Sequence, residues 1–372
     1  MIVFLIGCLS PTSDPKTQQS LSEGDDYGCF GVSPKVDDRQ VIVHSTPYND
    51  DGSQGVLWNA SVFDASSKTM SHLAEFEMGR KTIGTISFTP DGSHGFVAQQ
   101  DGTIGQFRIE EQGVTVLETG LTGDWYAQDV WFDPADGKLW IVDPNWPENG
   151  GGIYHADVDC ETGEIGSASL ALPTKNAFGV FPLDLENIVV VAREAFDSTA
   201  QVFLLDRASL ALIDSAVAFT HEDYNLSAVG ISPSHVFVGD NSSFSGTPNG
   251  FVAIELTTEG FGTQQWVAVL DPVSLVPSKD GSVMLVSSGY GDALHQYLPH
   301  LGELTEVVTS SASALPGVGA RIHRGYWEGS VLVPENLAIR LLSLAQSQVK
   351  DEGKIHQAEG FSGMIGSVGI TP

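Results

Sequence analysis

The chain has few cysteines, few basic residues and no long apolar segment. Its 372 residues include 3 cysteines, and 17 Lys and Arg stand against 47 Asp and Glu, for a formal net charge of −30. A surface of this sign repels nucleic acid phosphates and anionic lipid headgroups, so we expect neither as a partner. No segment approaches the roughly 18 apolar residues of a membrane span. The simplest interpretation of the acidity is solubility.

Local signatures of catalysis are also missing. The 10 histidines form no His-x-x-x-His pair and no Cys/His cluster, which disfavours zinc. The sequence has no Gly-x-Ser-x-Gly elbow, no phosphate loop ending in Gly-Lys-Ser/Thr and no Gly-x-Gly-x-x-Gly after a strand. A fold built from repeated units can draw catalytic residues from several of them, so these absences lower the expectation of an enzyme without removing it.

Glycine and proline are abundant, with 41 and 18 residues, as is typical of a chain rich in turns. The stretch Ile83 to Glu110 holds three short apolar runs separated by Asp91-Gly92 and Asp101-Gly102. Such runs predict antiparallel strands joined by tight turns, because glycine supplies the positive φ that these turns need.

This pattern repeats along the chain. A proline follows an apolar strand at positions 90, 134, 182, 233, 277 and 372, at intervals of 44 to 51 residues and then 95. The last gap corresponds to two repeats, with Arg324 in the place of proline. Arrays with a period of about 40–50 residues and four strands per unit predict a β-propeller.

Aligning the seven strands on that position supports the repeat. Large apolar residues stand two places before it: Phe88, Phe132, Val180, Ile231, Leu275, Ile322 and Ile370. Mostly small residues stand three places before it: Ser87, Trp131, Gly179, Gly230, Ser274, Arg321 and Gly369. We interpret this alternation as one face packed between blades and one directed towards a crowded axis, with Trp131 and Arg321 as exceptions.

The two ends of the repeat region predict how the ring closes. Residues 366–372 resemble an innermost strand with no blade after it, whereas Gln40 to His44 resembles a second strand with no innermost strand before it. We therefore expect the C-terminal strand to complete the first blade and remove exposed edges. The prediction is an all-β, seven-bladed propeller of four-stranded antiparallel blades over residues 36–372.

The unit Ile-Ser-Phe-Thr-Pro-Asp-Gly, Phe-Val-Ala, Gly-Thr-Ile-Gly-Gln-Phe-Arg-Ile resembles the repeat of bacterial YVTN/lactonase-like seven-bladed propellers. The resemblance covers residues 38–372 and is sharpest around 83–110, 128–165 and 227–256. It implies the fold and offers lactonase-like hydrolysis as one activity, although propellers host many functions.

The N-terminus, residues 1–8, ends in Leu-Ile-Gly-Cys and resembles a bacterial lipobox with Cys8 as the lipidated residue. It lacks a basic n-region and its apolar run is short, so a misassigned start or an accidental match are alternatives. Residues 9–35 are polar and predict a flexible tether, or an ordinary frayed terminus. The protein is then expected to be exported, either to the periplasm or as a lipid-anchored protein of a bacterial membrane, with the outer membrane favoured. Cys29 and Cys160 remain to form a disulfide or stay free.

Loop lengths predict which face of the ring binds. Connections from the second to the third strand of each blade are mostly long, and they share a face with the connections between blades. We name this the long-loop face and the opposite one the short-turn face. The chain enters the first blade at the short-turn face, so a tether would point the long-loop face away from a membrane.

Polar and aromatic residues gather at the predicted channel mouth and on the long loops. The candidates for ligand binding are Trp125, Tyr126, Gln128, Asp129, Trp131, Asn145, Trp146, Glu148, Lys175, Asn176, Asn225, Asp271 and Arg321. Trp146, between Asn145 and Glu148, suits contact with a sugar or peptide, or packs on a blade. Asp129, Asn176 and Asp271 are weak candidates for Ca²⁺, since each could instead bind its own loop backbone.

These features favour a monomeric, non-catalytic protein that binds a protein, glycan or other small ligand through its long-loop face, without a cofactor. The alternative is a lactonase-like or other hydrolase with a carboxylate-lined and Ca²⁺-bearing mouth. A structural surface protein without a specific ligand is a third interpretation, and it predicts a mouth plugged by loops.

Overall fold

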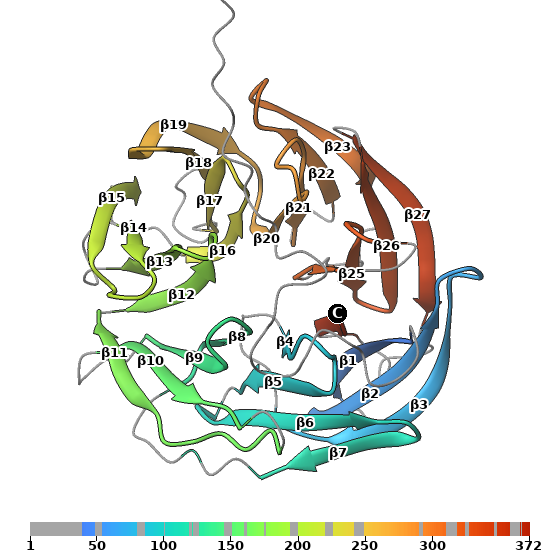
Figure 1. The fold of residues 1–372 in the computed structure, drawn as a ribbon. Helices are drawn as coiled ribbons and strands as arrows, with labels where there is room; N and C mark the ends of the chain where they lie inside the picture. Colours follow the sequence, from blue (N-terminus) through green and yellow to red (C-terminus); the bar gives the residue numbers. More distant parts are fainter. Residues whose placement is uncertain are drawn as a thin grey trace, which may run out of the picture.

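The computed structural model shows a ring of seven four-stranded antiparallel sheets (Figure 1). It describes residues 39–48, 54–79, 86–99, 101–118, 121, 126–144, 151–159, 162–174, 176–193, 200–219, 226–241, 249–289, 293–309, 318–323, 327–345, 348–357, 365 and 367–372. Within these ranges every element is a strand, and no helix is long and apolar enough to cross a membrane. The predicted seven-bladed propeller is confirmed.

Each blade runs from an innermost to an outermost strand. The first contains β28 (Ser367–Ile370), β1 (Gln40–Tyr48), β2 (Gln54–Asp64) and β3 (Thr69–Glu77). The second contains β4 (Ser87–Phe88), β5 (His94–Ala98), β6 (Ile104–Glu110) and β7 (Gly113–Leu117), and the third β8 (Asp129–Asp133), β9 (Lys138–Asp143), β10 (Gly152–Asp157) and β11 (Ser169–Pro173).

The remaining four blades follow the same order. They contain β12 (Ala177–Pro182), β13 (Asn187–Arg193), β14 (Ala200–Asp206) and β15 (Leu212–Phe219); β16 (Leu226–Ile231), β17 (His235–Asp240), β18 (Gly250–Thr257) and β19 (Gly260–Ala268); β20 (Pro272–Pro277), β21 (Met284–Ser288), β22 (Ala293–Leu298) and β23 (Glu303–Thr309); and β24 (Ala320–Arg321), β25 (Val331–Glu335), β26 (Ala338–Ala345) and β27 (Gln348–Gln357).

The C-terminal strand closes the ring as predicted. β28 pairs antiparallel with β1, with Ile42 opposite Ile370. Both isoleucines are buried, in a core cluster shared with the seventh blade. This pairing gives β1 an inner neighbour, so the first blade has the same four-stranded form as the others.

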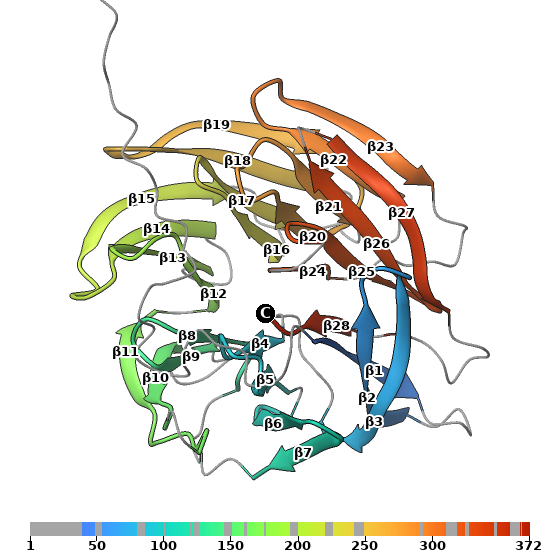
Figure 2. The same cartoon turned by 45° about the vertical axis from the view of Figure 1, so that its right-hand side comes forward.

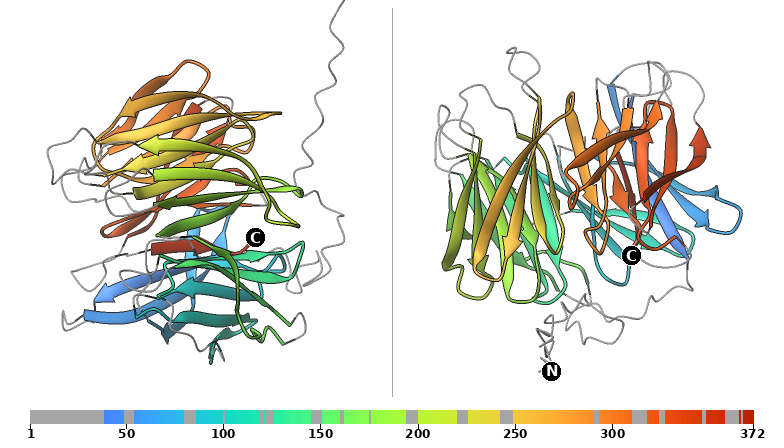
Figure 3. Two further views of the ribbon diagram at one scale, coloured as in Figure 1. Left: turned by 90° about the vertical axis from the view of Figure 1, so that its left-hand side faces the viewer. Right: turned by 90° about the horizontal axis from the view of Figure 1, so that it is seen from above.

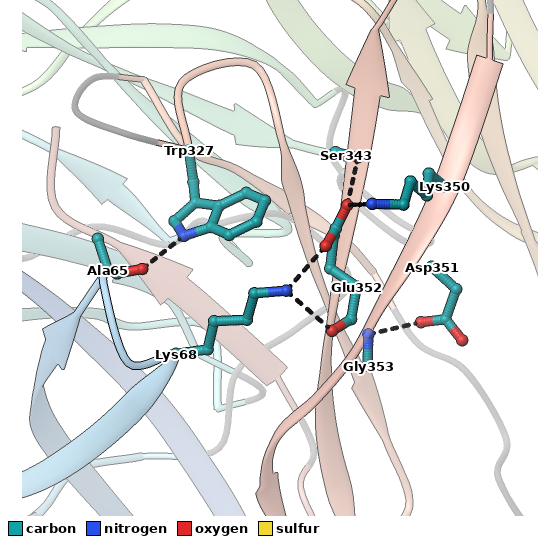
Figure 4. A network of polar contacts seen from close by, with 8 residues as sticks. All are labelled: Ala65, Lys68, Trp327, Ser343, Lys350, Asp351, Glu352 and Gly353. Atoms are coloured by element: carbon teal, nitrogen blue, oxygen red, sulfur yellow. Dashed lines mark hydrogen bonds and ion pairs between the residues drawn. The ribbon is translucent and has the colours of Figure 1, made fainter.

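A polar network joins the first and seventh blades further out (Figure 4). Lys68, in the turn between β2 and β3, lies 2.8 Å from the carboxylate of Glu352 on β27. Its ammonium also lies 4.7 Å from the ring centroid of Trp327, whose Nε1 donates to the Ala65 carbonyl at 2.9 Å. Glu352 also accepts from Lys350 and Ser343, and with the Lys350 hydrogen bond as the leading cause its pKa is lowered to about 2.

The core lies between the blades and explains the alternating apolar positions. Phe132 on β8 stacks on Phe96 of the preceding blade, with ring centroids 5.8 Å apart. In the same way Leu275 on β20 packs in a cluster with Phe237 and Phe251 of the blade before it. The large residues therefore fill the interface with the preceding blade.

The small residues of the same strands face the next blade, which corrects the prediction that they point to the axis. Ser87 Oγ accepts the backbone N–H of Phe132 at 2.8 Å, and Ser274 Oγ accepts that of Gly319 at 2.9 Å. Side chains stand perpendicular to a sheet, and here both sheet faces meet neighbouring blades, so only the strand edge faces the axis. Small residues let successive innermost strands approach closely.

Arg321 does not share the orientation of the other small-residue positions. It pairs with Val331, which packs against Val283 of the preceding blade. Its neighbours Ala320 and Ile322 pack instead in the cluster shared with the next blade. The sequence alignment of this blade is therefore shifted by one residue, and such a shift exchanges the two faces of a strand.

Several aspartates stabilise the tight turns between strands. In the β4–β5 turn, Asp91 Oδ1 accepts the backbone N–H of Ser93 at 3.0 Å and the hydroxyls of Thr89 and Ser93 at 2.7 Å each. The same capping by one carboxylate oxygen recurs at Asp64, Asp101, Asp159, Asp184, Asp206 and Asp280. These aspartates stabilise turns by satisfying backbone donors, in addition to carrying surface charge.

Candidate functional site at the long-loop face

The strands of the blades end at two opposite faces of the ring (Figure 3), and the sequence that separates consecutive strands differs in length between these faces. On the short-turn face, connections such as 134–137, 232–234 and 258–259 are brief, with 158–168 and 322–330 as the longer ones. At the long-loop face, 8 to 11 residues of sequence separate β9 from β10, β17 from β18, β7 from β8 and β23 from β24. Of the predicted site residues, Trp125, Asn145, Trp146, Glu148, Lys175 and Asn225 lie outside the described residues, as do Cys8, Cys29 and Cys160.

Among the predicted channel-mouth residues that the structure describes, Tyr126 has an exposed aromatic side chain, with 47% of its surface accessible. Its backbone N–H donates to Asp143 Oδ1 at 3.3 Å, and the next amide, Ala127, donates to the Gly102 carbonyl at 3.2 Å. The segment before β8 is thus held by its own blade and by the preceding one. The phenol ring is presented to solvent on a fixed backbone.

Asp143 was not among the predicted site residues. It ends β9 and is 2% exposed, and buried acids end two other second strands, Asp240 on β17 and Glu335 on β25. In the sequence, these buried acids could have been found by their position. Each one stands four places after the first apolar residue of the second strand of its blade. At Asp143 the burial of a carboxylate is offset by its hydrogen bond to the connecting segment.

Gln128 and Asp129 lie where the segment between blades enters β8. The Gln128 backbone N–H donates to the Val142 carbonyl at 2.8 Å, which begins the pairing with β9. Asp129 is nearly buried, and its Oδ1 accepts the N–H of Val130 at 3.0 Å. One oxygen of this carboxylate is therefore used on the local backbone.

Asn176 and Asp271 occupy equivalent places just before β12 and β20, and both have a left-handed backbone, with φ of 49° and 47°. Asn and Asp adopt this conformation more readily than other residues with a side chain. Asp271 is 2% exposed, and its carbonyl accepts the N–H of Gly289 at 2.9 Å. The residue types are explained by the sharp turn into the innermost strand.

The three weak Ca²⁺ candidates come from three blades. In the described part of the chain, no group of three or more His, Cys, Asp or Glu side chains is placed to hold a metal ion. The alternative to metal binding, a hydrogen bond to the local backbone, is shown for Asp129. Asn176 and Asp271 instead have left-handed backbones.

Trp131 lies between the third and fourth blades. The Arg207 guanidinium carbon is 5.9 Å from the centre of the Trp131 ring, and Arg207 also donates to the fully buried carboxylate of Asp133. Burial raises the pKa of Asp133, while the charge of Arg207 acts in the opposite direction. Trp131 is therefore part of an interface between blades and covers a buried ion pair.

A histidine pair, which the sequence pattern did not indicate, lies between the first and seventh blades. The rings of His44 on β1 and His356 on β27 have centroids 5.3 Å apart. Burial, and then the proximity of His356, lowers the pKa of His44 to about 3. Both rings are thus uncharged at neutral pH, which allows the close approach.

Solved structures share this fold at low sequence identity. Hydrazine synthase from Kuenenia stuttgartiensis is 12% identical with a TM-score of 0.57, and the match covers 83% of this chain and 96% of that chain. A protein from Lactobacillus plantarum is 14% identical with a TM-score of 0.59, covering 90% and 100%. The Dos1 propeller is 11% identical with a TM-score of 0.52, covering 85% of each chain. The chain is a seven-bladed β-propeller.

No protein-family model and no curated protein sequence matches the chain. Identities of 11–14% show the shared fold alone. Because propellers host many unrelated functions, the function of this one has to be argued from its own residues.

Proposed function

We propose that this propeller is an exported, lipid-anchored binding protein that recognises a peptide or glycan through its long-loop face. The observation that carries the proposal is the contrast between Tyr126 and the acids beside it. The aromatic ring is solvent-exposed, whereas Asp143 and Asp129 are buried and accept backbone N–H groups. An exposed aromatic ring on a hydrogen-bonded backbone is suited to recognition, because it offers a flat apolar face and has few rotatable bonds.

The position of Arg39 supports the anchored arrangement. Arg39 donates to the carbonyls of Glu110 and Glu111 in the β6–β7 turn, at 3.0 and 2.8 Å, so the chain enters the ring at the short-turn face. The C-terminus lies at the same face, where Gly92 of the β4–β5 turn adjoins Thr371 (Figure 3). A lipid on Cys8 would then hold the short-turn face towards the membrane and present the long loops outwards.

Recognition is tested with the purified protein on peptide and glycan arrays. We expect binding that Tyr126→Ala reduces about tenfold or more, since a central aromatic contact contributes 2 kcal/mol or more. Leu170→Ala on the outermost strand β11, where the side chain is 49% exposed, is the matched control and should leave binding unchanged. Equal binding by both variants would exclude Tyr126 from the binding surface.

Anchoring is tested separately by expressing the full chain in a Gram-negative bacterium with labelled palmitate. The wild-type chain should incorporate label and fractionate with membranes, and Cys8→Ser should do neither.

Thiol counts on the native and reduced protein decide whether Cys29 and Cys160 are paired.

The second candidate function is lactonase-like hydrolysis, which rests on the repeat resemblance and the acidic mouth. Turnover of lactone substrates, reduced by Asp129→Asn or Asp271→Asn in a variant that retains wild-type thermal stability, would favour it over recognition alone.

A further inference from the structure

Arg207 is buried and Arg321 and Arg340 are partly buried, and of these three only Arg321 has no acidic partner among the residues that the structure describes. Arg207 contacts Asp133, and Arg340 contacts Glu335 and Asp351. Within the described ranges no carboxylate pairs with Arg321, and burial lowers its pKa. A partly buried charge without an acidic partner is unfavourable, so a site that keeps one is suited to a ligand that supplies the opposite charge.

The hydrogen bonding of Arg321 is also incomplete. One Nη donates to the carbonyl of Pro277, the last residue of β20. Its Nε is buried and has no hydrogen-bond partner among the residues that the structure describes. A guanidinium offers five N–H donors in a planar fork, a geometry that matches the oxygens of phosphate or carboxylate.

Two more donor groups lie near this arginine. His323 follows it after one residue and is accessible to solvent, although many protein atoms surround it. Its pKa is lowered to about 4 by burial among its neighbours and then by the charges of Arg321 and Lys279, with Glu328 acting in the opposite direction. The Lys279 ammonium, in the turn after β20, lies 3.2 Å from the carboxylate of Glu328, and both side chains are exposed. An incoming anion could replace Glu328 as the partner of Lys279.

The location is the short-turn end of the innermost strands. β20 and β24 border the centre of the ring side by side (Figure 2). Arg321 is the last residue of β24, and His323 and Lys279 follow the ends of β24 and β20. Positive charge is scarce here, since the chain carries a net charge of −30. Two nitrogen-bearing side chains, His323 and Lys279, near the Arg321 guanidinium are therefore a specific feature of this end of the ring.

We propose that Arg321, His323 and Lys279 form a binding site for a small oxyanion at the short-turn end of the ring. Arg321 supplies the charge and a forked pair of donors, neutral His323 donates one N–H, and Lys279 closes the site from the adjacent turn. The site is on the face opposite the proposed recognition surface, so the test of anion binding does not depend on that function.

Calorimetric titration of the full chain with inorganic phosphate, and separately with acetate, at constant ionic strength, tests the proposal. We expect saturable binding of at least one anion, weakened tenfold or more by Arg321→Met and unchanged by Arg108→Met, which removes an exposed arginine paired with Glu110. The anion that binds identifies the ligand as phosphate-like or carboxylate-like. No saturable binding of either anion, or equal binding by Arg321→Met, would overturn the site.

If Arg321→Met does not fold, His323→Ala and Lys279→Ala serve in its place. Each should weaken binding several-fold, and unchanged affinity in both would reject the proposal. The NMR titration of His323 supplies a second readout, because a bound anion offsets the charges of Arg321 and Lys279 and should raise the His323 pKa. A His323 titration that is the same with and without the anion would contradict binding at this place.

Discussion

The backbone N–H of Val41 donates to Thr371 Oγ1 at 3.0 Å, and the N–H of Thr371 donates back to the Val41 carbonyl at the same distance, joining residues 330 positions apart. This reciprocal pair lies beside the β1–β28 pairing. It brings the end of the described chain to its beginning, so the stability of the ring depends on a four-residue strand.

Weakening that strand should therefore lower the stability of the ring. We expect Ile370→Ala, which removes a side chain that is 3% exposed, to lower the free energy of unfolding by about 3 kcal/mol. Leu212→Ala on β15, where the side chain is 60% exposed, should change it by less than about 0.5 kcal/mol. Urea denaturation followed by tryptophan fluorescence measures both, and similar losses in the two variants would argue against a structural role for β28.

Close approach between innermost strands predicts that Gly230 cannot be enlarged. A Cβ at this position would lie 2.5 Å from the carbonyl oxygen of Leu275 in the next blade, and backbone atoms cannot easily move away. We expect Gly230→Ala to cost about 2 kcal/mol, within the range for overpacked cores. Gly113→Ala is the control, since a Cβ there meets nothing within 4 Å. A stable Gly230→Ala protein would mean that the blades can separate at this point.

The ion pair beneath Trp131 predicts a pH-dependent defect. Arg207→Met leaves the Asp133 carboxylate buried without its partner and should cost about 3 kcal/mol at pH 7. Burial already raises the pKa of Asp133 in the folded state above its ordinary value. The folded protein then binds the proton more tightly than the unfolded chain, so lowering the pH towards 4 should recover part of the loss. Arg108→Met, in an exposed pair, should cost less than about 1 kcal/mol at either pH.

The histidine pair predicts that acid lowers the stability of the fold, which is the opposite of the effect expected for Asp133. The pKa of His44 is about 3 in the folded protein, against an ordinary value of 6.5. Between these values the unfolded chain binds a proton that the folded protein does not, so stability should fall as the pH decreases from 6.5 towards 3, by up to about 1.4 kcal/mol per pH unit.

The variant His44→Phe should flatten this part of the stability curve, measured by urea denaturation from pH 7 to pH 4. His300→Phe, in the exposed turn between β22 and β23, is the matched control and should keep the wild-type slope. An unchanged slope in His44→Phe would assign the acid sensitivity to other groups.

The fold was predictable because its determinants are local and repeated. Alternation of apolar residues, the Asp-Gly turns and the period of 44 to 51 residues all follow from strand geometry, and seven copies of one pattern reinforce each other. The same reasoning was misleading for Arg321, because the strand before residue 324 has no proline to set its register, and a shift of one residue exchanges the faces.

The candidate site was less predictable, because the role of a polar residue depends on its partners. Asp271 and Asn176 carry the chemistry of metal ligands, yet their left-handed backbones show that the turn itself requires such residues. Asp143 was overlooked because its partner, the Tyr126 amide, belongs to the segment that crosses between blades. Such pairings cannot be obtained from spacing within one repeat.

By itself the sequence determined the number of blades, the strands and the closure of the ring, because periodicity and turn chemistry act between neighbours along the chain. Only the tertiary structure decided that the small residues face the next blade and that Asp133 and Arg207 form a buried pair. It also decided that Arg321 lies near His323 and Lys279, without an acidic partner in the described part of the chain. These relationships join residues from different blades. Their energies depend on burial and distance, which exist only once the ring has closed.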